Sequence, residues 1–217
     1  MTHRIVWILF FVTAPLCLIA VITGADVNLP GNDEGYAPPQ PIAYSHRLHA
    51  GELGIDCRYC HIAAESGRHA GIPPLGICMN CHRSVIAPIV DVRQEERIAA
   101  AEGRKPRQIV SNEIAKIYAG LSLNIDGTRI EGATPPGVTW TKVYDLPDFV
   151  YFDHSRHVNG GVDCSRCHGA VEAMERVRQV GDLSMGFCVN CHREAGPGHL
   201  DPQGRVRATI DCSGCHY

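Results

Sequence analysis

Residues 44–83 of this chain read Tyr44-Ser45-His46-Arg47-Leu48-His49, then Cys57-Arg58-Tyr59-Cys60-His61, then Cys78-Met79-Asn80-Cys81-His82-Arg83. The same three strings return about 108 residues later as Phe152-Asp153-His154-Ser155-Arg156-His157, Cys164-Ser165-Arg166-Cys167-His168 and Cys188-Val189-Asn190-Cys191-His192-Arg193. A last short unit, Cys212-Ser213-Gly214-Cys215-His216, precedes the final residue. Duplication of a unit with two C-x-x-C-H motifs is the simplest explanation, and it predicts a pseudo-symmetric arrangement.

Each C-x-x-C-H motif is typical of a covalently attached c-type haem. Two thiols three positions apart lie about one helical turn from each other, so both can form thioethers to one porphyrin, and the adjacent His can bind its iron. A zinc half-site or a dithiol pair is the alternative for an isolated C-x-x-C, but neither needs the adjacent His. Ten of the eleven cysteines follow this pattern: Cys57, Cys60, Cys78, Cys81, Cys164, Cys167, Cys188, Cys191, Cys212 and Cys215.

Five haems need five proximal ligands, which we predict to be His61, His82, His168, His192 and His216. Seven of the twelve histidines remain. His3 is set aside because it precedes the apolar segment 5–22, a predicted membrane span, and would lie on the opposite side of the membrane from the haems. The candidate distal ligands are therefore His46, His49, His69, His154, His157 and His199. In each i, i+3 pair both imidazoles share one helical face, and we expect them to serve two different haems. Met174 or Met185 is the thioether alternative for one haem, at Cys188 and Cys191.

Residues 5–22 carry no charge and follow Arg4, which predicts an uncleaved transmembrane anchor with the haem domain on the periplasmic, extracytoplasmic face. A signal-peptide core is the alternative. Cys17 lies in this apolar run, and Leu16 before it does not fit a lipidation motif. Covalent haem attachment takes place outside the cytoplasm, which also predicts an extracytoplasmic haem domain.

We divide the chain into six parts. An anchor (1–25) and a Pro- and Gly-rich tether (26–43) precede a first two-haem module (44–83). A haem-free insert (84–150), a second two-haem module (151–193) and an extension with the fifth haem (194–217) follow. Within the insert, apolar spacing predicts helices at 91–101 and 112–121, and 138–143 reads as a possible strand. The charge-rich helix 91–101 is either a solvated face or a docking surface.

Composition indicates how these parts pack. Aromatic residues make up only 6% of 217 residues, which is little for a core made of side chains. We therefore expect a mainly α-helical and irregular multihaem cytochrome c fold, packed around its cofactors, with duplicated haem modules. No basic run suggests nucleic acid as a partner.

The chain resembles the pentahaem cytochrome subunit of alternative complex III over nearly its whole length. The resemblance rests on the single anchor, on the strings at 46–61 and 146–157, on Gly71-Ile72-Pro73-Pro74, and on Leu183-Ser184-Met185-Gly186-Phe187-Cys188. The [Tyr/Phe]-x-His-x-x-His device also resembles class III cytochromes. That resemblance implies that His46 serves the haem on Cys57 and Cys60, and His154 the haem on Cys164 and Cys167.

In such a complex a polytopic membrane subunit oxidises quinol, such as menaquinol, and electrons pass through an iron-sulfur subunit. The resemblance thus implies an electron-transfer subunit of a respiratory or photosynthetic complex that delivers electrons to a mono-haem cytochrome c or a blue copper protein. No catalytic site is expected on this chain. The alternatives are a multihaem reductase with one open haem iron, and a self-sufficient membrane-anchored quinol dehydrogenase.

Overall fold

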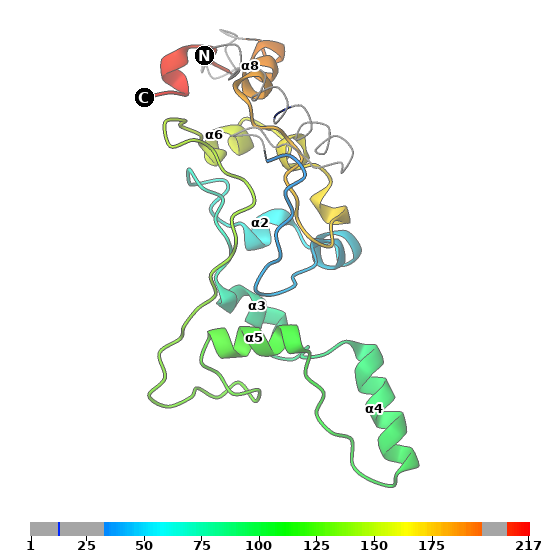
Figure 1. Ribbon diagram of the computed structural model, residues 1–217. Helices are drawn as coiled ribbons and strands as arrows, with labels where there is room; N and C mark the ends of the chain where they lie inside the picture. Colours follow the sequence, from blue (N-terminus) through cyan, green and yellow to red (C-terminus); the bar gives the residue numbers. More distant parts are fainter. Residues whose placement is uncertain (1–12, 14–32, 197–207) are drawn as a thin grey trace, which may run out of the picture.

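The computed structural model describes Thr13, residues 33–196 and residues 208–217. The predicted anchor lies outside these residues apart from Thr13, and so do Cys17 and His199. No helix within the described ranges is long and apolar enough to cross a membrane. The described chain is elongated, with short helices following one another along its length (Figure 1).

The helices are short and joined by irregular segments. In chain order they are η1 (Arg47–Glu52, a π-helix), α2 (Cys57–Cys60), α3 (Leu75–His82), α4 (Ile89–Ala101), α5 (Asn112–Gly120), α6 (His154–Asn159), α7 (Ser165–His168), η2 (Val171–Ala173), α8 (Met185–Glu194) and η3 (Cys212–Gly214). The mainly helical and irregular fold is therefore confirmed for the described residues. Residues 62–74 between α2 and α3 contain no helix, as their turn residues predict.

The insert contains two helices close to the predicted positions, α4 and α5. Ser111 caps α5 by accepting a hydrogen bond from the backbone N–H of Glu113, as a serine at this position commonly does. The strand predicted at 138–143 is wrong. These residues pair with no strand, because the backbone N–H and C=O of Thr141 bond to the side chain of Gln40 instead. Only two isolated β-bridges occur among the described residues, Leu123 with Arg129 and Val150 with His216.

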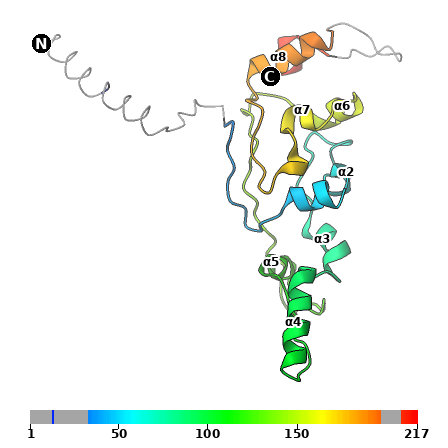
Figure 2. The same cartoon turned by 90° about the vertical axis from the view of Figure 1, so that its right-hand side faces the viewer.

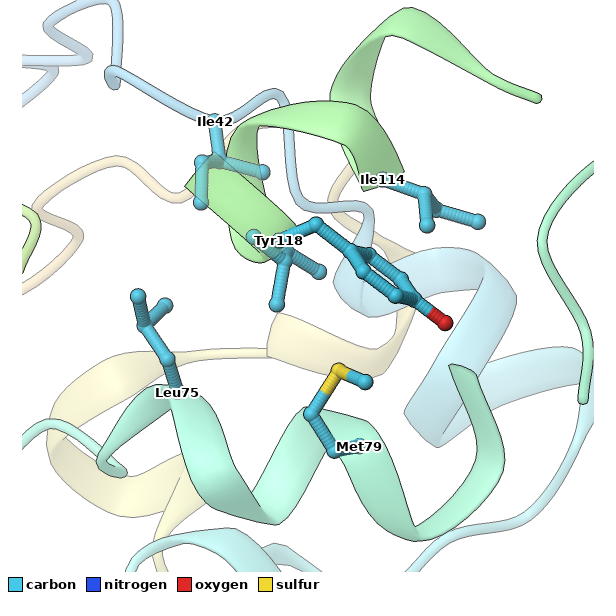
Figure 3. Close-up of a cluster of buried hydrophobic side chains, with 6 residues drawn as sticks. Ile42, Leu75, Met79, Ile114 and Tyr118 are labelled. Carbon is cyan, nitrogen blue, oxygen red and sulfur yellow. The ribbon is translucent and has the colours of Figure 1, made fainter. Parts of the chain in front are cut away.

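The apolar core lies between α3 and α5, where the insert meets the first module. Its buried members are Ile42, Leu75, Met79, Ile114, Ile117 and Tyr118. Figure 3 shows Tyr118 from α5 lying over Met79 from α3. The Tyr118 hydroxyl donates a hydrogen bond of 2.9 Å to the backbone C=O of His82. This cluster thus fixes the end of the second C-x-x-C-H motif against the insert.

The two halves of the duplication pack on each other reciprocally. Helix η1 lies on the segment after the third motif, where the backbone N–H of Arg47 donates to the C=O of Met174 at 2.9 Å. Helix α6 lies on the matching segment after the first motif, where the backbone N–H of His154 donates to the C=O of Arg68 at 3.0 Å. Each histidine-pair helix therefore docks on the other half, as expected for a pseudo-symmetric arrangement.

Candidate haem sites

Three of the five motifs begin with the same aspartate cap. Asp56, Asp163 and Asp211 each stand directly before a first cysteine, and each carboxylate accepts a hydrogen bond of 2.8–3.0 Å from the backbone N–H two residues later. Such a cap holds the chain in a helical turn, which brings the two cysteines to the same side. Ser184 caps α8 in the same way by accepting from the N–H of Phe187 at 3.1 Å. The capping role of these residues was not predicted, although the repeated Asp-Cys pair is visible in the sequence.

The motif cysteines are free and accessible. All ten are unpaired thiols, exposed or half-buried. Helices α2, α7, α8 and η3, which carry four of the motifs, contain no buried residue. Within the described ranges, no three His, Cys, Asp or Glu side chains gather to hold a bare metal ion. The thiol pairs and the uncovered space around them fit a large group bound through two thioethers, such as haem c.

Six imidazoles are held in the tautomer that a metal needs. In each, Nδ1 lies 2.5–2.9 Å from a backbone carbonyl oxygen: His49, His61, His82, His154, His157 and His192. A carbonyl can only accept, so Nδ1 carries the proton and Nε2 presents its lone pair. This is the arrangement by which proteins orient metal-binding imidazoles. The carbonyl partners of His49, His82 and His157 lie within four residues in sequence, whereas those of His61, His154 and His192 lie ten or more residues away and could not be predicted from the sequence.

Three pairs of imidazole rings lie at nearly the same distance from one another. The ring centres lie 6.1 Å apart for His49 and His82, 6.3 Å for His154 and His168, and 5.9 Å for His157 and His192. Two metal–imidazole bonds of about 2 Å each, with the ring radii added, place ring centres roughly 6 Å apart. Each distance therefore matches the separation expected for two imidazoles bound to one iron. In each pair one ring belongs to a C-x-x-C-H motif and the other to a His-x-x-His device.

The two His-x-x-His devices have nearly the same geometry. Tyr44 lies edge-on to His46 at 4.8 Å, and Phe152 lies edge-on to His154 at 4.8 Å. The same aromatic rings stack on the second histidines, with 4.4 Å between Tyr44 and His49 and 4.5 Å between Phe152 and His157. The aromatic residue therefore fixes both imidazoles at once. By this repetition His46 corresponds to His154, and the ring expected opposite it is that of His61.

Two further imidazoles are kept neutral by their surroundings. Burial, followed by the charges of His61 and His49, lowers the pKa of His46 to about 4. Burial, followed by His154 and His61, lowers the pKa of His168 to about 4. Nδ1 of His46 is buried without a hydrogen-bond partner. Neutral imidazole is the form that binds iron, so both groups are in the required state at neutral pH.

The remaining candidate distal ligands are His69 and His199. His69 is exposed and follows Arg68, whose guanidinium bonds to the carbonyls of Phe152 and Val150. Val150 in turn forms the bridge with His216 of the fifth motif, so His69 lies in the segment next to that motif. His199 lies outside the described residues.

The two methionines differ in exposure. The side chain of Met174 is half-buried beside η1, and Met185 at the start of α8 is 68% exposed. No contact among the described residues places either thioether opposite a motif histidine. The imidazole of His157 lies opposite His192 of the motif for which the thioether was considered.

Part of the chain matches a known protein family. Residues 150–217 match the family model described as cytochrome c7 and related cytochrome c. This segment is therefore similar to cytochrome c7 multihaem domains. The prediction of covalently bound haem c in an electron-carrying multihaem cytochrome is confirmed at this level, whereas the count of five haems stays a prediction.

One relative is similar to this chain over a longer stretch of sequence than the family model covers. Over 129 residues, 59% of this chain, the sequence is 26% identical to the menaquinone reductase multiheme cytochrome c subunit of Nitratidesulfovibrio vulgaris. The chain spans 45% of the length of that relative. Bound haem c supplies an iron that exchanges single electrons. The residues described above would hold, orient and shield such a group through their thiols, imidazoles and aromatic rings.

Proposed function

We propose that this chain is the electron-transfer subunit of a membrane quinone-linked complex, with five haem c groups each bound by two histidines. The observation that carries the proposal is the set of three facing imidazole pairs at 5.9–6.3 Å. An iron with both axial positions filled by imidazole exchanges electrons but offers no position to a substrate. This favours electron conduction over a reductase with an open haem.

The same pairs support a ligand assignment. The five motif histidines are the proximal ligands, and the distal ligands are the device histidines opposite them. His49 serves the haem at Cys78 and Cys81, and His157 serves the haem at Cys188 and Cys191. His154 serves the haem at Cys164 and Cys167, and the repeat gives His46 to the haem at Cys57 and Cys60. His69 or His199 remains for the haem at Cys212 and Cys215.

The partners and location follow from the sequence. Residues 5–22 anchor the chain, and the haem domain stands on the extracytoplasmic face. The resemblance to alternative complex III supports a polytopic quinol-oxidising subunit and an iron-sulfur subunit as neighbours. It also supports a mono-haem cytochrome c or a blue copper protein as the acceptor.

A second candidate reverses the direction of the electrons. The relative described above is named as a subunit of a menaquinone reductase, so a complex of that kind would deliver electrons to menaquinone through this chain. The same bis-histidine sites serve both directions, because a chain of saturated irons conducts either way. The partner that binds the chain decides between them.

Purification of the complex from membranes tests the proposal. We expect five haems per chain, low-spin spectra and no stoichiometric binding of carbon monoxide by the reduced protein. A polytopic subunit and an iron-sulfur subunit should co-purify, and quinol should reduce the haems only in their presence. Rapid uptake of one carbon monoxide per chain would contradict the proposal and favour the open-haem alternative. Haem reduction by quinol in the isolated chain would instead favour a self-sufficient dehydrogenase.

A further inference from the structure

The order of the motifs in space differs from their order in the sequence. Along the long axis of the molecule the helices that carry them follow one another as α3, α2, α7 and α8, with the C-terminal motif beside α8, and both views agree (Figures 1 and 2). The second motif thus lies beyond the first, at the end occupied by the insert. Contacts between neighbouring motifs fix this order independently of the views.

The first and second motifs are direct neighbours. The side-chain amide of Asn80, inside the second motif, donates a hydrogen bond of 2.9 Å to the hydroxyl of Tyr59, inside the first. On its other side, α3 packs against the insert through Leu75, Met79 and Tyr118. The second motif is therefore covered by the haem-free insert and has only the first motif as a neighbour among the described motifs.

The first motif continues into the third. The segment after the first motif bonds to α6, where the side-chain amide of Asn159 donates to the C=O of Glu65 at 2.9 Å. The N–H of Ser155 donates to the C=O of Gly67 at 3.2 Å. Burial, followed by the nearby Cys164 thiol, raises the pKa of Cys57, which agrees with the two motifs being adjacent.

The third, fourth and fifth motifs then follow in sequence order. Arg166, inside the third motif, bonds to Glu194 at the end of α8 at 2.8 Å. Nδ1 of His192, in the fourth motif, donates to the C=O of Thr209, three residues before Cys212, at 2.5 Å. Burial, followed by the nearby Cys215 thiol, raises the pKa of Cys188. Each motif thus contacts the next one.

We propose that the five haem sites form a single file in the order second, first, third, fourth, fifth, so that the second and fifth motifs are its two ends. This inference rests on the five-haem electron-transfer function proposed above. A donor at one end would be oxidised as it passes an electron to the first iron; each iron would then be reduced by the preceding one, which is thereby reoxidised, and the last iron would pass the electron to the acceptor at the other end. The partners on either side of the chain therefore dock at the insert end and at the C-terminal end.

Electron injection at the fifth motif tests the order in the full-length holoprotein. Tyr217 is 80% exposed, so Tyr217→Cys, combined with Cys17→Ser, gives one thiol for a ruthenium photosensitiser beside the fifth motif. One variant then removes the first haem (Cys57→Ala with Cys60→Ala), and a matched variant removes the second (Cys78→Ala with Cys81→Ala). The readout is the number of haems that become reduced rapidly after repeated flashes.

The proposed file predicts opposite results for the two variants. Loss of the second, terminal haem leaves four connected haems, all reduced rapidly. Loss of the first, internal haem isolates the second, so only three are reduced rapidly and one slowly. The reverse result would mean that the haems follow sequence order, and equal counts would mean that they are not in single file; either outcome overturns the inference.

A second measurement does not depend on the variants folding. Iron positions in the wild-type holoprotein, determined by cryo-electron microscopy, should place the iron of the second motif farther from the fifth than the iron of the first. A terminal first-motif iron would overturn the inference. A wild-type haem count other than five, measured as pyridine haemochrome, would contradict the proposed function, while the order of the sites that are filled would still be decided by the iron positions.

Discussion

At the scale of single residues, the carbonyl partners of the imidazoles give the most information. His61 donates from Nδ1 to the C=O of Gly71 at 2.6 Å, and His192 donates to the C=O of Thr209 at 2.5 Å. A ring fixed in this way presents Nε2 in one direction only. The sequence predicted which histidines can bind iron, but the direction in which the rings of His61, His154 and His192 point depends on carbonyls ten or more residues away.

The first prediction concerns His49, whose ring lies opposite His82. We expect His49→Ala to leave the iron of the second motif with one open axial position. One haem of the five should then become high-spin and bind carbon monoxide, at about one per chain, with the other four unchanged. Electron paramagnetic resonance and carbon monoxide titration measure this. Leu48→Ala, on the same π-helix, is the control and should stay low-spin; an unchanged spectrum for His49→Ala would contradict the pairing.

The second prediction is a pH dependence from His46 and His168, whose folded-state pKa values are lowered to about 4. In the unfolded chain these groups have a pKa near 6.5. Between these values the unfolded state binds more protons, so the free energy of unfolding falls as the pH drops from about 6.5 to about 4. We expect the thermal midpoint of the holoprotein to be constant from pH 8 to 7 and to decrease below pH 6.5. A midpoint independent of pH down to 4.5 would argue against neutral, buried imidazoles.

At the scale of elements, the contact of η1 with η2 shows how the two halves are joined. A Cβ at Gly51 in η1 would lie 2.3 Å from the backbone oxygen of Glu172 in η2. Close by, Arg47 bonds to Glu175 at 2.9 Å. Glycine at position 51 therefore allows the first histidine pair to approach the second half of the chain.

The third prediction uses this close approach. In an ordinary helix Gly→Ala stabilises by about 0.5–1 kcal/mol, but Gly51→Ala requires η1 and η2 to move apart. We expect it to lower the free energy of unfolding by about 1–3 kcal/mol, as overpacking does. Gly76→Ala is the control, because a Cβ there meets no protein atom within 4 Å. Chemical denaturation of both variants measures the difference, and equal effects would show that the contact of η1 with η2 is loose.

The fourth prediction concerns the insert helix α4. The Glu95 carboxylate accepts from Arg104 at 2.5 Å and from the backbone N–H of Arg107 at 2.8 Å, which ties the following loop to the helix. Hydrogen bonds from Arg104, then from Arg107, lower the pKa of Glu95 to about 2. The ionised Glu95 carboxylate therefore stabilises the folded state at pH values above its ordinary pKa of about 4.3. This stabilisation is lost as the pH falls toward about 2.

We expect Glu95→Gln to increase protease cleavage at residues 102–108 several-fold at neutral pH, with haem spectra unchanged. Glu96→Gln, on the exposed face of the same helix, is the control and should leave the cleavage rate unchanged. Equal cleavage of the two variants would show that Glu95 does not anchor the loop.

At the scale of the whole molecule, the side-chain core is small and lies at one end. Apart from the cluster around Tyr118, which is 1% exposed, the elements with the other four motifs bury no residue. A chain of this length normally encloses a larger apolar core. We infer that haem faces provide most of the packing surface in the mature protein.

The fifth prediction follows from that distribution. When the chain is secreted without its haems, we expect residues 151–196 to be unfolded. The insert and α3 should keep partial structure through the Tyr118 cluster. Hydrogen exchange of the haem-free chain should show protection confined to α3 and α5, with the haem-loaded chain as the control. Protection across α6, α7 and α8 without haem would contradict the inferred role of the cofactors in packing.

The sequence by itself determined the cysteine and histidine inventory, the duplication and the two insert helices, because these depend on spacing within short segments. It also placed a strand at 138–143, where a remote side chain, that of Gln40, occupies the backbone groups instead. Only the tertiary structure decided which imidazoles face each other and that the second motif lies outside the first. Both depend on contacts between the two halves, such as Arg47 with Met174 and Asn159 with Glu65, which no local pattern encodes.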